Sequence, residues 1–156
     1  DFSGTYVGKV TPLADIATDK RRLDSYTTEL AVNQSTLYAG YPWRFTHFRK
    51  TFGYANMPLD GLWLRAPYLH NGSVPSLRDL LEPAVQRPKV FYRGNDLYDP
   101  VRVGFVSNLP EEDGKLYFEF DTRTEGNTNV GHEGKAYGTE LSADDKTALV
   151  EFLKTF

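Results

Sequence analysis

The sequence predicts a mainly α-helical domain with long ordered loops and a small β-hairpin. Two short segments, 76–81 and 142–155, carry helix-start signals followed by regularly spaced apolar residues. Only one segment, 115–122, alternates strongly between apolar and polar residues. Glycine and proline are scattered along the whole chain, which is typical of a loop-rich fold. The 156 residues suffice for one core, so we expect 1–156 to form a single domain.

The clearest predicted helix covers 142–155. Ser142 is followed three residues later by an acid, the spacing of a capping box that satisfies free N–H groups at a helix start. Leu149, Leu153 and Phe156 then recur at spacings of four and three, so we expect this helix to dock through one face.

The second predicted helix covers 76–81 and has the same start signal. Ser76 and Asp79 are spaced as a capping box, and three leucines give the segment an apolar face. Pro83 follows closely and favours a stop, because proline cannot continue a helix. Weaker helical patterns cover 13–24 and 27–37.

The predicted hairpin rests on the alternating segment 115–122, which follows an Asp-Gly turn. The nearest apolar segment upstream is 101–106, so we expect it to form the other strand of the hairpin.

Composition and motifs exclude several classes of protein. The net charge of −3 argues against nucleic-acid binding, and no run approaches the roughly 20 apolar residues of a membrane span. No cysteine is present, which excludes disulfides, thiolate metal sites and a C-x-x-C-H haem-attachment motif within the chain. Nucleotide-binding loops and the G-x-S-x-G hydrolase motif are also absent.

Two of the three histidines lie in unusual loops. His70 follows Pro67 and precedes Gly72, so its imidazole is carried by a rigid, irregular loop, in either a functional or a structural role. His132 follows Gly131, which allows close backbone approach to a flat group; the alternative is an exposed loop histidine.

The remaining candidate side chains are His47 and Met57. Phenylalanines and basic residues surround His47, which we interpret as a packing or surface residue. Met57 is the only methionine, and its thioether is either a metal ligand or core filling.

Residues 57–83, MPLDGLWLRAPYLHNGSVPSLRDLLEP, resemble the C-terminal haem domain of bacterial di-haem cytochrome c peroxidases. The APYLHNGSVP block is most similar to the branch of that family that includes the rubber oxygenases. The order of later blocks, among them Arg87-Pro88 and Gly131-His132-Glu133, extends the resemblance over about residues 11–156. The fold that this resemblance implies is a partial cytochrome c-like domain.

The resemblance also implies roles for particular residues. His132 is expected to be the distal axial ligand of the haem iron, with Met57 as the alternative ligand. His70 is expected in the haem pocket, near the propionates or the region between the haems. Trp63 and Tyr68 are expected to line the pocket or an electron path.

The family further implies cofactors and partners that lie outside this chain. Haem c would be held by an attachment motif expected just before residue 1, in a haem-bearing N-terminal portion of a parent protein. A calcium ion is expected near Arg65 and Pro67. The parent is expected to be a periplasmic or secreted electron-transfer protein of the peroxidase or oxygenase type, working with a redox partner. The isolated chain is expected to be inactive. The alternative is a haem-free binding or structural module that retains the scaffold.

Overall fold

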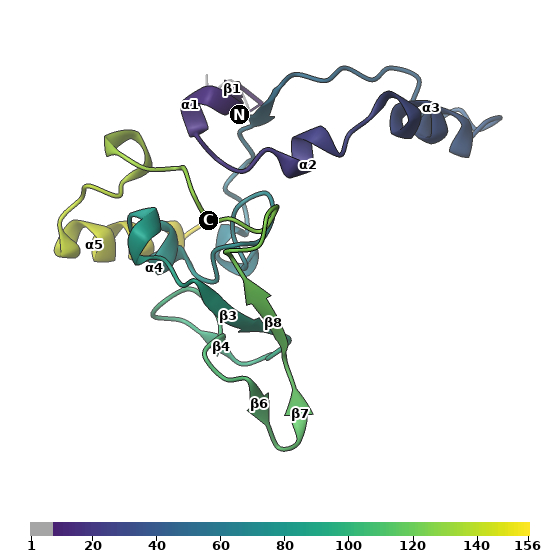
Figure 1. The fold of residues 1–156 in the computed structure, drawn as a ribbon. Helices are drawn as coiled ribbons and strands as arrows, with labels where there is room; N and C mark the ends of the chain where they lie inside the picture. Colours follow the sequence, from purple (N-terminus) through teal and green to yellow (C-terminus); the bar gives the residue numbers. More distant parts are fainter. Residues whose placement is uncertain (1–7) are drawn as a thin grey trace.

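The computed structural model describes residues 8–156 as short helices and small antiparallel sheets joined by long loops (Figure 1). Only 28% of the structure is helical and 17% is strand, so the prediction of a mainly α fold is wrong. Part of the physical reason is that proline follows the short helices Leu77–Leu80 and Ala84–Gln86 within three residues and cannot continue them. The helices Leu13–Ile16 and Arg21–Asp24 also stop after about one turn, although no glycine or proline directly follows them.

The helices fall into two size classes. α3 and α5 are the only ones in the described chain that exceed one turn. The α-helices are α1 (Leu13–Ile16), α2 (Arg21–Asp24), α3 (Thr28–Leu37), α4 (Leu77–Leu80) and α5 (Ala143–Leu153), and the 3-10 helices are η1 (Leu62–Leu64), η2 (Ala84–Gln86) and η3 (Lys135–Tyr137).

The strands of residues 8–156 form four two-stranded antiparallel sheets, with pairs β1–β2, β3–β8, β4–β5 and β6–β7. Their bounds are β1 (Val10–Pro12), β2 (Gly53–Ala55), β3 (Val90–Arg93), β4 (Tyr98–Asp99), β5 (Gly104–Phe105), β6 (Glu111–Glu112), β7 (Lys115–Leu116) and β8 (Phe118–Asp121).

The predicted hairpin has the wrong partner. β8 does form within 115–122, but it pairs with β3, where Phe91 lies opposite Phe120 and both rings are buried 5.0 Å apart. The tight turn at Asp113 instead joins β6 to β7. The burial of two aromatic rings across β3–β8 outweighs pairing with the nearer segment.

Both capping predictions are confirmed. The hydroxyl of Ser76 accepts a hydrogen bond from the N–H of Asp79, and that of Ser142 accepts one from Asp145. α4 and α5 then contribute Leu77 and Val150 to the buried core. The other buried members of this core are Tyr68, Val74, Leu81 and Val103.

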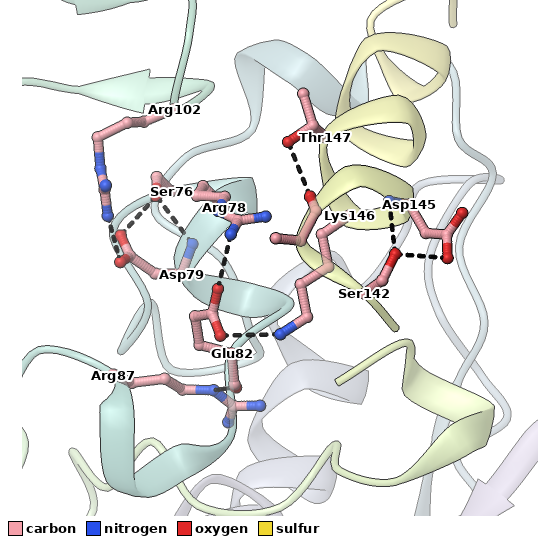
Figure 2. A network of polar contacts seen from close by, with 11 residues as sticks. Ser76, Arg78, Asp79, Glu82, Arg87, Arg102, Ser142, Asp145, Lys146 and Thr147 are labelled. Atoms are coloured by element: carbon pink, nitrogen blue, oxygen red, sulfur yellow. Dashed lines mark hydrogen bonds and ion pairs between the residues drawn. The ribbon is translucent and has the colours of Figure 1, made fainter. Parts of the chain in front are cut away.

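A polar network joins α4 to α5 beside this core (Figure 2). The Lys146 ammonium, almost fully buried, donates to the Glu82 carboxylate at 2.8 Å. Glu82 also pairs with Arg78 at 3.1 Å, so one carboxylate serves two cations. On the far side of α4, Asp79 pairs with Ser76 and Arg102.

α3 and the segment 38–52 that follows it form an aromatic arm. Figure 1 shows α3 projecting away from α4, α5 and the β3–β8 ribbon. α3 buries none of its residues, and Tyr41, Trp43 and Phe45 are exposed. No helix among residues 8–156 is long and apolar enough to cross a bilayer.

Candidate functional site

A cleft of about 670 Å³ opens between the β1–β2 region, the loop that carries His70 and the loop that carries His132. Four of the predicted site residues line it: His70, His132, Tyr68 and Met57. Its volume lies within the range of sites for small organic ligands and cofactors. The lining is mostly apolar, with Ile16, Leu62, Leu69 and Leu80 among its residues.

The His132 loop reaches the cleft through a close backbone approach to α1. Gly131 lies against α1 so tightly that a Cβ there would sit 2.4 Å from the carbonyl oxygen of Ile16. His132 has a positive φ of 53°, and its backbone N–H donates to the same oxygen at 3.0 Å. A glycine at position 131 is therefore what lets this histidine enter the cleft.

The His132 ring is neutral and lacks a hydrogen-bond partner at Nδ1. Burial, together with the charges of Arg87 and His70, lowers the pKa of His132 to about 4. Nδ1 is buried and makes no hydrogen bond. The ring contacts Tyr137 edge-on at 5.4 Å. A neutral imidazole is the form that binds metals.

The His70 ring stacks on Tyr54 of β2, with centroids 4.4 Å apart and planes inclined by 24°. Backbone bonds between Tyr68 and Val74 close the loop that presents the ring. Burial lowers the pKa of His70, while the charge of Asp19 offsets part of this effect. Neither ring nitrogen makes a well-formed hydrogen bond, although the Asp19 backbone faces the ring.

Asn71 and Asp19 tie the two histidine loops together. The Asn71 amide donates to the carbonyl oxygens of Gly126 and Thr128, at 3.1 and 2.9 Å. The Asp19 carboxylate accepts from the N–H of Gly126 and the hydroxyl of Thr128. Burial would raise the pKa of Asp19, but these bonds and one from the Arg21 backbone lower it on balance. The relative placement of the two rings is thus fixed by side-chain bonds.

Two cations, Arg22 and Arg65, also line the cleft. Arg65 donates to the carbonyl oxygens of Pro58 and Asp60, at 3.0 and 2.6 Å. Arg65 therefore places its own positive charge where a calcium ion is expected from the resemblance. Within residues 8–156, no group of three or more His, Cys, Asp or Glu side chains could hold a metal ion, so calcium has no support.

The other predicted site residues, Tyr68, Met57 and Trp63, lie at different places relative to the cleft. Tyr68 is buried at the cleft wall, and its hydroxyl donates to the backbone at Leu62 and Val103. Met57 is 68% exposed at the cleft mouth. Trp63 lies outside the cleft, in a smaller apolar pocket of about 300 Å³, edge-on to Tyr98 at 6.2 Å.

Sequence reasoning missed Tyr54, Tyr137 and Arg87. Tyr54 and Tyr137 contact the two histidine rings from other segments, and only the aromatic richness of the chain hinted at such contacts. Arg87 is buried and bonded to main-chain carbonyls, including that of His132. No sequence pattern marks this role of Arg87, because any residue type can supply the main-chain carbonyls that it binds.

The cleft suits a flat, apolar cofactor whose metal ion can accept a histidine nitrogen as a ligand. Two neutral imidazoles with unpaired buried nitrogens face one cavity, where an unpaired polar atom is costly unless a ligand satisfies it. Aromatic and aliphatic walls match a porphyrin ring, and Arg22 can meet carboxylates at its edge. The residues present therefore fit haem.

Comparisons with known proteins agree with this chemistry. Residues 53–92, which include β2, Met57 and the His70 loop, match the family described as RoxA-like, cytochrome c-like. The match supports the resemblance to cytochrome c-like proteins of this branch and suggests a cytochrome-related role.

Two relatives come from Sinorhizobium fredii. The protein y4iJ is 38% identical over 144 residues, which cover 88% of this chain and 23% of y4iJ. The protein y4iM is 40% identical over 118 residues, which cover 66% of this chain and 27% of y4iM. The chain therefore spans about a quarter of the length of these curated relatives.

Proposed function

We propose that this chain forms the distal side of a haem c pocket in a periplasmic or secreted electron-transfer protein of the di-haem peroxidase or oxygenase type. In this proposal His132 would ligate the haem iron. The observation that carries it is the pair of neutral imidazoles, His132 and His70, in one cleft of about 670 Å³.

Each residue has a distinct part in this proposal. His132 offers a neutral ring nitrogen to the iron, on a loop that α1 and Asn71 hold in place. His70, stacked on Tyr54, presents a second uncharged ring to the pocket and can hydrogen-bond a propionate or a bound molecule. Tyr68 closes one apolar wall.

Bound haem would supply redox chemistry, while the residues of this chain would set ligation, access and electron transfer. The attachment cysteines and the proximal histidine belong to the haem-bearing portion of the parent protein in this proposal. A redox partner completes the electron path.

The experiment compares single variants of the parent protein, matured with haem c, by absorption spectroscopy. We expect His132→Ala to convert the low-spin spectrum to a high-spin one, because an axial position is vacated. Met57→Leu serves as the control and is expected to leave the spectrum unchanged, since Met57 is exposed. The opposite pattern would assign the ligand to Met57. A wild-type protein without a Soret band would refute the haem pocket and favour a haem-free module.

A further inference from the structure

The Arg87 guanidinium is the most buried charged group in the described chain, with 2% of the residue exposed. No carboxylate of residues 8–156 lies within ion-pair distance of it. Burying a charge is costly unless hydrogen bonds replace its water. The structure meets this requirement with main-chain oxygens alone.

The five N–H donors of Arg87 match five carbonyl oxygens. Two belong to the end of α4 and the turn after it, where Nε donates to Glu82 at 2.9 Å and Nη2 to Leu80 at 3.4 Å. Figure 2 shows Arg87 beneath this end of α4, next to Glu82. The other three belong to the segment 129–132.

On that segment, Nη1 donates to Asn129 at 2.5 Å and to Gly131 at 2.9 Å, and Nη2 donates to His132 at 3.0 Å. One side chain therefore joins the core helix to the backbone of the cleft histidine. The His132 ring itself has no hydrogen bond at Nδ1. Its position therefore depends on the placement of its backbone and on packing against Tyr137, not on a hydrogen bond at Nδ1.

We propose that Arg87 is a positioning residue, which holds His132 in ligating position by fixing the 129–132 backbone against the end of α4. The proposal rests on the haem pocket proposed above and deepens it. A lysine has three donors and cannot satisfy five carbonyls, so the fork geometry of arginine is required as well as its charge.

The test uses the haem-loaded parent protein and exogenous imidazole, which binds iron only when His132 leaves it. Arg87→Lys and Arg87→Gln should bind imidazole at least about tenfold more tightly than wild type, the factor expected from the loss of one charge-assisted hydrogen bond. A high-spin component should appear in their spectra. Arg78→Lys is the matched control, because Arg78 contacts Glu82 and makes no bond to 129–132.

The outcomes separate the two proposals. If His132→Ala changes neither the spectrum nor imidazole binding, the axial assignment fails. If His132→Ala changes both but the Arg87 variants match wild type, the positioning role is overturned.

If both Arg87 variants fail to fold, nitrogen-15 spectra of arginine-labelled wild-type protein provide the test instead. One slowly exchanging guanidinium that shifts with haem oxidation state supports the role, and only rapidly exchanging guanidinium signals overturn it.

Discussion

The backbone N–H of His132 donates a hydrogen bond to the carbonyl oxygen of Ile16, although α1 lies at the other end of the sequence. The contact requires Gly131, where a Cβ would lie 2.4 Å from that oxygen and 2.7 Å from backbone atoms of Ala17 and Thr18. The part of the cleft wall formed by α1 and the loop that carries His132 are therefore held together by a hydrogen bond and by close backbone packing.

Gly131→Ala tests this close packing. We expect a loss of about 2–4 kcal/mol in the free energy of unfolding, from left-handed backbone strain at φ +77° plus the clash with α1. Urea denaturation followed by circular dichroism measures it. Gly114→Ala is the matched control, since Gly114 has φ +79° and open space around it, and we expect a loss of about 1–2 kcal/mol. Equal losses in the two variants would contradict the close approach.

The stability of the haem-free chain should depend on pH through His132. Its pKa in the folded chain is about 4, below the ordinary value of 6.5, so the unfolded chain binds more protons between these values. Stability is therefore full above pH 6.5 and falls as the pH drops toward 4, by at most about 3 kcal/mol. His70 acts in the same direction.

Urea midpoints measured from pH 4 to pH 7 check this dependence. His132→Gln should flatten the curve, because the substituted side chain does not titrate. His47→Gln is the control, since His47 is exposed outside the cleft. A pH dependence that survives His132→Gln unchanged would assign it to other groups.

Lys146→Ala tests the network that joins α4 to α5. We expect it to lower the free energy of unfolding by about 2–3 kcal/mol, because a nearly buried ion pair loses one partner while Glu82 keeps Arg78. Thermal or urea denaturation measures the loss. Lys154→Ala removes a more exposed pair with Glu151 on the same helix and should cost less than about 1 kcal/mol. Similar costs would show that burial adds nothing to the Lys146 pair.

The parts of the fold that sequence reasoning captured are those encoded within a few neighbouring residues. The capping boxes at Ser76 and Ser142 each involve a hydroxyl and an N–H three positions apart, so the pattern contains the whole interaction. The partner of β8 was missed because β3 lies far upstream, and the Phe91–Phe120 contact leaves no local trace. The helix content was overestimated for the related reason that most helical starts stop after one turn.

The residues of the candidate site could likewise be predicted only where the local sequence marks them. His70 and His132 could be selected because glycine and proline mark their loops, and the resemblance reinforced both. Trp63 is predicted to line the pocket or an electron path; its side chain lies beside Tyr98 in a separate apolar pocket, so of these two roles only the electron path stays a prediction. The role of Arg87 could not be predicted, since its partners are carbonyl oxygens brought together only by the fold.

The aromatic arm has a thermodynamic consequence. α3 buries no residue, and an isolated helix of its length is marginal in water, so the arm contributes almost nothing to the cooperative core. Its local unfolding costs far less free energy than global unfolding and leaves both histidine loops intact. The chain thus combines a packed centre with the aromatic arm, a peripheral segment of low local stability.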